Sequence, residues 1–292
     1  MQIKQLLCVA ATAVLVGAGQ RTVFSILLLA LAVLAGPVNA QTEEELAAFA
    51  AKAQDPLGDV KAIMTDNTIG FNGGPNDDTS YGFQIQPVYS LDTSGDWNMI
   101  LRGIVPVIGV EPGVVVPPIG PEPRPPQGST WGIGDSIMQM FFSPKSDSAW
   151  KWGIGPQVSL KTQTSDRVAG PGWGYGAAGV VFGGAGNFAL GSIFMYHWGE
   201  GDFEVGTIQP IILYNFPSNP GMYLGYNNAI TYNPKAESGN TWMVPLGLTF
   251  GKSILLGSGN GMDLSIGVYD VTQRVEDGSS WQFKFGISYF FN

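Results

Sequence analysis

The chain carries little charge. Asp, Glu, Lys and Arg make up 13% of its 292 residues, whereas 45% of the residues are apolar. Ordinary soluble domains are roughly 25% charged. So low a charged fraction argues against water as the main solvent of the folded chain.

Cysteine and histidine are almost absent, with one of each, Cys8 and His197. A single cysteine cannot form a disulfide within the chain, and Cys and His are the usual ligands of zinc. The run "GPGWGYGAAG" is rich in glycine, but it falls inside a predicted strand, where glycine lets side chains pack and strands bend. We therefore expect no metal site, no phosphate-binding loop and no cofactor.

Long apolar runs are missing after residue 40. No stretch there approaches 18 consecutive apolar residues, which excludes a helical membrane protein. The 41 glycines and 20 prolines argue against a helical bundle, because both residues weaken helix interiors. If this chain spans a membrane, it must do so with strands.

Residues 1–40 are typical of a cleaved export signal. Arg21 lies between two apolar runs, and Val38 and Ala40 give the small-residue pattern of a cleavage site before Gln41. The alternative is a pair of transmembrane helices, but each run has 14 residues and a span needs about 20. Removal of residues 1–40 leaves 12 basic against 23 acidic residues, a net charge of −11, which argues against nucleic acid as a partner.

Period-two patterns run through the rest of the chain. In "SYGFQIQPVYSL" the odd positions are mostly apolar and the even positions include Gln84 and Gln86, as in a strand with one apolar and one polar face. "WKWGIGPQVSLK", "TWMVPLGLTFGK", "MDLSIGVY" and "WQFKFGISYFFN" alternate in the same way. The predicted strands are 59–71, 80–91, 96–108, 130–143, 149–162, 172–183, 187–198, 203–216, 221–232, 241–253, 261–273 and 279–292.

These segments predict an all-β fold, a closed antiparallel transmembrane β-barrel of about twelve strands at residues 57–292. An even number of strands of this length is typical of outer-membrane barrels, which also carry aromatic girdles. The eight tryptophans divide accordingly. Five lie at predicted outer strand ends and three at inner ends: Trp131, Trp173, Trp198, Trp242 and Trp281, then Trp97, Trp150 and Trp152. The alternative is a large soluble sandwich with tryptophan in its core.

Two segments outside the strands need separate predictions. Residues 41–56 predict a short helix, because Thr42 and Glu45 are spaced as a capping box. We expect a loose periplasmic helix, with plugging of the lumen or contact with the base of the barrel as the alternatives. Residues 109–129 are rich in proline and predict an extended outer loop. A solvated loop is favoured there over an inward constriction.

Amide and charged side chains recur on the polar faces of the strands. Charges facing lipid cost about 2–4 kcal/mol each at the bilayer midplane, so we expect these residues to line the lumen. The candidates are Gln84, Gln86, Asn98, Arg102, Asp135, Gln139, Lys151, Gln157, Lys161, Gln209, Asp263, Tyr269, Gln282 and Lys284. The pattern leaves open whether the lumen is an open pore or a plugged barrel.

His197 is the only candidate for a catalytic base. A barrel lipid hydrolase needs a histidine beside a serine nucleophile. Ser192 lies five positions before His197 and on the opposite face of the strand. We therefore predict no enzyme activity and no catalytic residues.

Several runs resemble a known family of outer-membrane barrels. They are "DWNMILRGIVPVI", "WGIGD", "FFSP", "WKWGIGPQVSLKT", "IQPIILYNFP", "SGNTWMVPLGLTFGK" and "SSWQFKFGISYFF". They are similar to the neuromedin U-like proteins, the group named for the MetA pathway of phenol degradation, over roughly residues 57–292. The resemblance implies a Gram-negative outer-membrane barrel with a transport role and passage of small, hydrophobic or aromatic molecules.

The end of the chain resembles the signal by which the barrel assembly machinery recognises its substrates. Lys284, Gly286, Tyr289 and Phe291 have the matching spacing, and Asn292 adds one residue beyond it. We expect a porin-like channel for small solutes, with outer-membrane lipid and the assembly machinery as partners. The alternatives are a lipid hydrolase and a closed structural or surface-recognition barrel. The sequence does not predict an oligomeric state.

Overall fold

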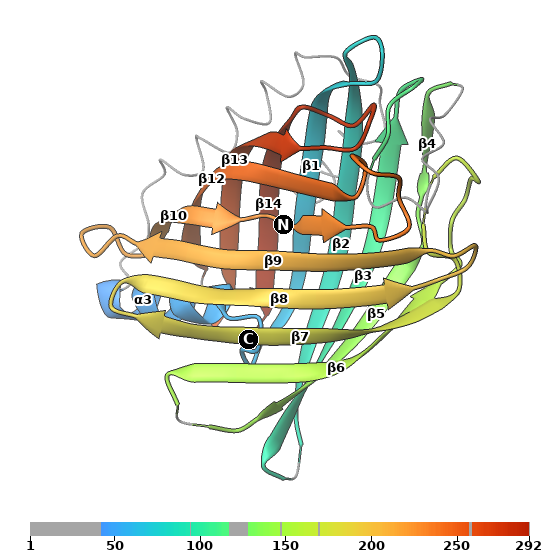
Figure 1. Ribbon diagram of the computed structural model, residues 1–292. Coiled ribbons are helices and arrows are strands. Elements are labelled where there is room, and N and C mark those ends of the chain that lie inside the picture. Colours follow the sequence, from blue (N-terminus) through green and yellow to red (C-terminus); the bar gives the residue numbers. More distant parts are fainter. Residues whose placement is uncertain are drawn as a thin grey trace, which may run out of the picture. The chain divides into compact units, whose positions relative to one another are not determined.

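The structure, a computed structural model, describes residues 42–93, 95–116, 128–146, 148–168, 170–256 and 259–291. These residues form one antiparallel sheet and one α-helix, α3, Glu43–Gln54 (Figure 1). The strands are β1 Lys61–Gly73, β2 Asp78–Asp92, β3 Trp97–Val110, β4 Thr130–Ile133, β5 Ser136–Pro144, β6 Trp150–Leu160, β7 Gly174–Ala185, β8 Phe188–Trp198, β9 Glu204–Asn215, β10 Met222–Asn227, β11 Ile230–Tyr232, β12 Trp242–Leu255, β13 Gly261–Gln273 and β14 Trp281–Phe291.

The sheet closes on itself. β4 and β5 both pair with β3 and act as one strand of the barrel, and β10 and β11 both pair with β9 and β12. Counted in this way, twelve strands form a closed antiparallel barrel. The predicted fold class is confirmed, and every predicted strand segment overlaps an observed strand.

The two interrupted strands differ from the continuous strands that the sequence predicts. The first break is at Gly134 and Asp135, and the second is at Asn228 and Ala229. At the first, the Asp135 carboxylate accepts from the backbone N–H of Gly172 at 2.7 Å. At the second, the side-chain oxygen Oδ1 of Asn228 accepts from the N–H of Ala229 at 2.9 Å. At both breaks a side chain takes up backbone donors, as buried backbone requires.

β1 and β14 close the barrel. Their pairing extends from Lys61, opposite Phe291, to Phe71, whose ring stacks on Trp281 with centroids 4.0 Å apart. In the middle of the seam, Thr65 Oγ1 donates to the carbonyl oxygen of Ile287 at 3.0 Å and accepts from its N–H at 2.9 Å. The seam is therefore held by side-chain as well as backbone hydrogen bonds.

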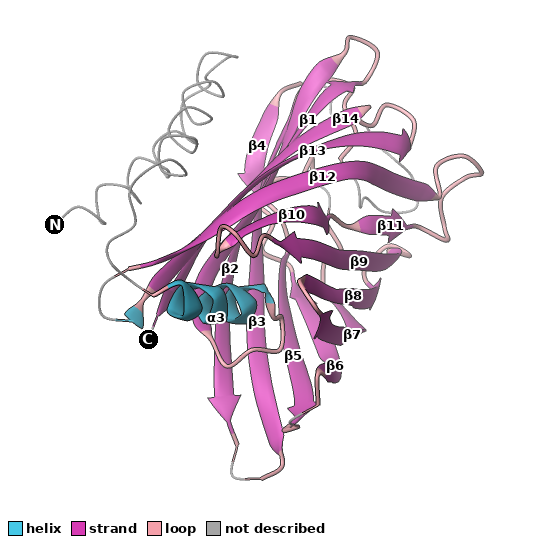
Figure 2. Cartoon of the chain, turned by 90° about the vertical axis from the view of Figure 1, so that its left-hand side faces the viewer, coloured by secondary structure: helices cyan, strands magenta, loops and turns pink. Residues whose placement is uncertain are grey.

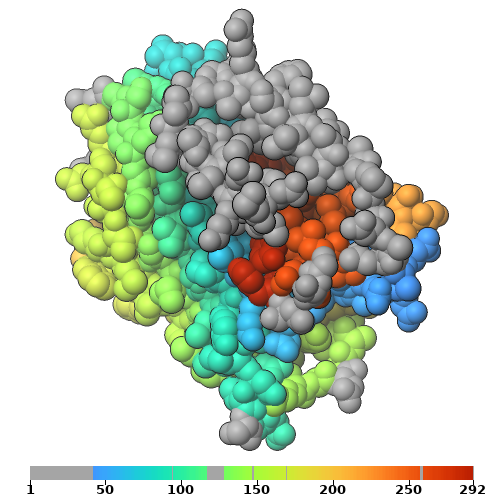
Figure 3. All heavy atoms as spheres, turned by 180° about the vertical axis from the view of Figure 1, so that it is seen from behind, coloured from blue at the N-terminus to red at the C-terminus, as the bar shows by residue number. Residues whose placement is uncertain are grey.

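The two faces of the middle of the strands differ as the alternation predicts. Ile154 and Leu248 point outward, with 60% and 58% of their surface exposed, whereas Gln157 points inward and is 2% exposed. The predicted tryptophans lie near strand ends, in two groups at opposite ends of the barrel. We call these ends the α3 end, where β1 begins, and the loop end, where β1 meets β2. The hairpin between β2 and β3 projects at the α3 end (Figure 1; teal at the lower edge of Figure 3).

Helix α3 is docked on the strands, which corrects the prediction of a loose helix (Figure 2). The predicted capping box is present, with Thr42 and Glu45 each binding the other's backbone. Phe49 contacts Phe290 of β14 edge to face, with centroids 5.5 Å apart. Gln54 and Asn215 of β9 exchange two amide hydrogen bonds of 2.8 and 3.1 Å. The thin apolar stripe of α3 suffices because the barrel offers a matching apolar surface.

An apolar layer lies in the α3 half of the barrel interior. Its buried members come from almost every strand: Leu57, Val60, Ala62, Val88, Ile100, Phe141, Ala178, Val180, Phe182, Ala189, Ile193, Ile211, Leu213, Tyr223 and Phe290. Phe49 and Ala53 of the α3 segment pack against this layer. The α3 end is thus closed by hydrophobic packing.

The start of the proline-rich loop turns inward, which corrects the preference for a solvated loop. Val114 and Val115 are almost fully buried. The N–H of Val115 donates to the carbonyl oxygen of Asp277 at 3.1 Å, and Val115 forms a parallel bridge with Gly278. Val115 and Val116 line a cavity inside the barrel. Residues 117–127 lie outside the described residues, so for most of the loop the choice between a solvated loop and a constriction stays a prediction.

Some predictions fall outside the described part of the chain. The export signal at residues 1–40 and the terminal Asn292 are not among the described residues. The boundary between signal and mature chain therefore stays a prediction. No helix among the described residues is both long and apolar enough to cross a membrane.

A glycine at the α3 end tests the docking of the helix. A Cβ on Gly261 would lie 2.1 Å from the Phe49 ring, so Gly261→Val should displace Phe49 and free α3, at a cost of about 2 kcal/mol of apolar burial. We expect α3 to become sensitive to protease while the barrel stays folded. Gly82→Ala is the control, because no atom lies within 4 Å of its Cβ position. Equal protease resistance in the two variants would contradict the docking.

Candidate functional site

Two cavities occupy the barrel interior. The loop-end cavity has a volume of about 300 Å³ and lies among inward side chains of β1–β3, β8, β9 and the β10–β11 break. The α3-end cavity has a volume of about 170 Å³ and reaches Ala53, Gln54 and Pro56 next to α3. The lumen therefore holds a larger chamber at the loop end and a smaller chamber at the α3 end.

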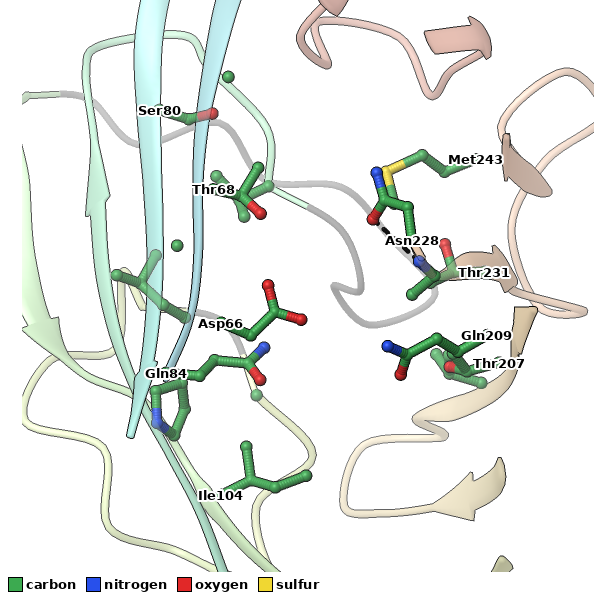
Figure 4. A pocket seen from close by; sticks show the side chains of 18 of the residues that line it. Asp66, Thr68, Ser80, Gln84, Ile104, Thr207, Gln209, Asn228, Thr231 and Met243 are labelled. Carbon is green, nitrogen blue, oxygen red and sulfur yellow. Dashed lines mark hydrogen bonds between the residues drawn. The ribbon is translucent and has the colours of Figure 1, made fainter. Parts of the chain in front are cut away.

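Five side chains line both cavities and form what we call the polar ring. They come from strands around the barrel: Asp66 (β1), Gln86 (β2), Arg102 (β3), Gln209 (β9) and Lys284 (β14). Figure 4 shows Asp66 and Gln84 on one wall and Gln209 on the wall that faces them. Any solute that moves between the two chambers must pass these groups.

One half of the ring is an ion pair. Lys284 Nζ lies 3.0 Å from Asp66 Oδ1 and donates to Asn228 Oδ1 at 3.2 Å. The Lys284 side chain is 11% exposed and that of Asp66 is 31% exposed. Because the two charges are largely removed from bulk water, each depends on the other for compensation.

The other half of the ring is a cation held by amides. Arg102 donates from Nη2 and Nε to Gln86 Oε1, at 2.7 and 3.2 Å, and from Nη1 to Gln139 Oε1 at 3.5 Å. Gln86 in turn donates to Gln84 Oε1 at 2.7 Å. The guanidinium is held in place by neutral acceptors, and no carboxylate of the described chain lies within ion-pair distance of it.

The amide network continues from Arg102 to His197. Gln139 Nε2 donates to Gln157 Oε1 at 2.8 Å, and Gln157 Nε2 lies 3.2 Å from His197 Nδ1. His197 Nε2 lies 2.9 Å from Ser159 Oγ, whose hydroxyl donates to the carbonyl oxygen of Gly172 at 2.8 Å. A serine has one hydroxyl proton, so the imidazole must donate from Nε2 and accept at Nδ1.

This arrangement bears on the hydrolase alternative. The structure brings His197 to Ser159, a serine that the sequence analysis did not consider, and not to Ser192. An activated nucleophile needs its hydroxyl proton directed to the imidazole, whereas the Ser159 proton is directed to Gly172. Both side chains are at least 95% buried. The pair therefore has the geometry of a structural hydrogen bond.

Charged groups at both rims are paired. At the α3 end, Lys151 Nζ binds Asp55 Oδ2 at 2.6 Å, which ties the segment after α3 to β6. At the loop end, Lys161 Nζ binds Glu200 Oε2 at 2.7 Å. The hydrogen bond from Lys161 to the Glu200 carboxylate, together with its negative charge, raises the pKa of Lys161. Among the described residues there is no group of Asp, Glu, His and Cys that could hold a metal ion.

The structure distributes the predicted lumen residues over three places. Nine line the cavities: Gln84, Gln86, Arg102, Asp135, Gln157, Gln209, Asp263, Gln282 and Lys284. Gln139 and Tyr269 are buried in side-chain networks beside the cavities. Asn98, Lys151 and Lys161 lie near the rims, Asn98 opposite Ser143 on β5.

Sequence reasoning missed several residues of the lumen. Asp66 lies within a predicted strand but was not selected, although its charge in the middle of a strand was a signal for an inward position. Asn228 was not selected because the strand break that turns it inward has no clear pattern in the sequence. Ser159 is in a predicted strand, but its contact with His197 joins positions 38 residues apart.

The fold resembles that of solved outer-membrane proteins. An outer membrane channel from Pseudomonas putida F1 matches with a TM-score of 0.55 and 12% identity, over 81% of this chain and 97% of that one. The NanC porin matches with a TM-score of 0.47 and 13% identity, over 80% and 99%. No family model matches the chain, and no curated protein matches its sequence. The first likeness shows a shared fold at a level of identity that fixes no function.

The ion pair of the polar ring yields a stability prediction. Lys284→Met leaves Asp66 without its cation and should lower the free energy of unfolding by about 2 kcal/mol, less than a fully buried pair because Asp66 is partly exposed. Adding Asp66→Leu should restore much of that loss. Urea unfolding in liposomes measures both values. Lys161→Met is the control, because it breaks an exposed pair and should change the free energy of unfolding little. If the losses from Lys284→Met and Asp66→Leu simply add in the double variant, the two residues are not coupled.

Proposed function

We propose that the chain is an outer-membrane channel that admits small molecules. The observation that carries this proposal is a closed barrel with two chambers joined at a polar ring. A structural barrel needs only a packed interior, whereas this one has about 300 Å³ of cavity at the loop end. The likeness in fold to an outer membrane channel is compatible with the proposal.

The outer surface supports placement in a membrane. Outward positions are apolar and exposed along the strands, and tryptophans lie at both ends of the barrel, as aromatic girdles do at membrane interfaces. The closed sheet leaves no strand edge in lipid. In this orientation the α3 end faces the periplasm and the loop end faces outside. Tyr289 and Phe291 of the proposed assembly signal then face the acyl chains.

The two chambers favour solutes with an apolar portion. Part of the wall of the α3-end cavity comes from the apolar layer, including Ile100, Phe141 and Ile193, and the rest is largely polar. Sugars and ions gain little from such a wall, whereas small hydrophobic or aromatic molecules gain apolar burial. This supports the substrate class implied by the family resemblance.

Helix α3 is the proposed stopper of this channel. It closes the periplasmic end through the buried Leu46 and Ala50, the Phe49 ring, the Gln54–Asn215 amide pair and the Asp55–Lys151 ion pair. Because none of these contacts belongs to the β-ladders, α3 can leave while the ladders of the barrel stay intact. Solutes then pass from the small chamber to the periplasm.

Planar-bilayer recording tests the proposal. We expect rare, brief openings from the intact protein. Replacing Gln54 and Asp55 by Ala should raise the open time several-fold, because it removes both polar anchors of the α3 segment. Lys52→Ala is the matched control on the exposed side of α3. Absence of any conductance in all three folded proteins would overturn the channel and favour the closed structural barrel.

A further inference from the structure

Arg102 retains donors that no described residue uses. A guanidinium has five N–H groups. Three of them point to Gln86 and Gln139, which leaves one N–H on each terminal nitrogen. One N–H on each terminal nitrogen is enough to donate to the two oxygens of a carboxylate. Arg102 also lines both cavities, so a solute can reach it from either chamber.

The remaining charges of the ring cancel. Lys284 is paired with Asp66, while Gln86 and Gln209 are neutral. Asp263 lines the small chamber, but its two oxygens accept hydrogen bonds from Tyr223 at 2.8 Å and Ser253 at 2.7 Å. Arg102 is therefore the one ring cation with no carboxylate of the described residues within ion-pair distance, and only the more distant charge of Asp66 acts on it. A bound anion would supply the counter-charge that Arg102 lacks.

The small chamber beside Arg102 sets the size of the rest of the solute. Its volume is about 170 Å³, with Ile100, Val180 and Ile193 in its wall. An apolar protein cavity of about 150 Å³ holds one benzene molecule. The chamber therefore offers room for one six-membered ring next to a cation.

We propose that the polar ring and the small chamber form a binding site for a small amphipathic monocarboxylate. The carboxylate binds the two free N–H groups of Arg102, and the apolar body occupies the chamber towards α3. This inference rests on the proposed channel function and names the substrate class of that channel. The Arg102 site selects charge, and the chamber selects a body the size of one ring.

Calorimetric titration of the detergent-solubilised full chain at neutral pH tests the site directly. The probes are benzoate, cyclohexanecarboxylate, neutral benzamide and acetate. We expect both ring carboxylates to bind the wild type, and benzamide and acetate to bind at least about tenfold more weakly, since one lacks the charge and the other the apolar body. Equal binding of benzoate and benzamide would overturn the role of Arg102.

Variants separate the two halves of the site. Arg102→Gln should weaken benzoate at least about tenfold and leave benzamide unchanged. Arg274→Gln is the matched control, because Arg274 lines only the large chamber, and benzoate affinity should stay within about twofold of the wild type. Ile193→Phe fills the small chamber and should weaken both ring carboxylates more than acetate. Circular dichroism checks that each variant folds. If Arg102→Gln does not fold, Ile193→Phe and the four ligands with the wild type still test the proposed site.

Binding and conduction can fail separately. Bilayer openings without preferential benzoate binding would overturn the carboxylate site and leave the channel standing. Benzoate binding that depends on Arg102, in a protein that never conducts, would support the site and overturn the channel. Benzoate flux that slows in Arg102→Gln while benzamide flux does not slow is the result expected if both are right.

Discussion

Closure between β1 and β14 is the constraint on which the rest of the structure depends. Without it, β1 and β14 would each present an edge of unpaired backbone N–H and C=O groups. The hydrogen bonds between Thr65 and Ile287 hold the middle of the seam. Once the sheet is closed, every strand has an inside and an outside. The alternation along each strand then assigns apolar side chains to one surface and amides and charges to the other.

The interior is graded from end to end. The loop end holds a large chamber with Val115 at its border, the middle holds the polar ring, and the α3 end holds an apolar layer. A wet interior from end to end would leave α3 nothing to pack against. An apolar interior from end to end would bury Arg102 and the Lys284–Asp66 pair away from water and from the polar groups that stabilise their charges. The gradient allows one barrel to contain a stopper, a charged ring and a ring-sized chamber.

The sequence predicts the strands of the barrel better than the contacts inside it. Strand segments and inward positions such as Gln86 follow from period two, which is a local property. The break at Asn228, the inward turn at Val115 and the His197–Ser159 contact depend on residues that meet only after closure. The docking of α3 was underestimated because its apolar stripe is thin, and the complementary surface around Gly261 and Phe290 is contributed by strands more than 200 residues away. The cleaved signal, the membrane placement and the family resemblance stay predictions.

Cysteine labelling along β9 in intact outer membranes tests the central claim most directly. With Cys8 replaced by Ser, single cysteines at Thr207 and Gln209, which line the large chamber, should react with a water-soluble maleimide. Cysteines at Ile208 and Ile212, which point outward with 40% and 47% of their surface exposed, should not react, because lipid covers them. Labelling that alternates in this way supports a water-filled barrel in a membrane. Equal labelling of all four positions, or stronger labelling at Ile208 and Ile212, would contradict it.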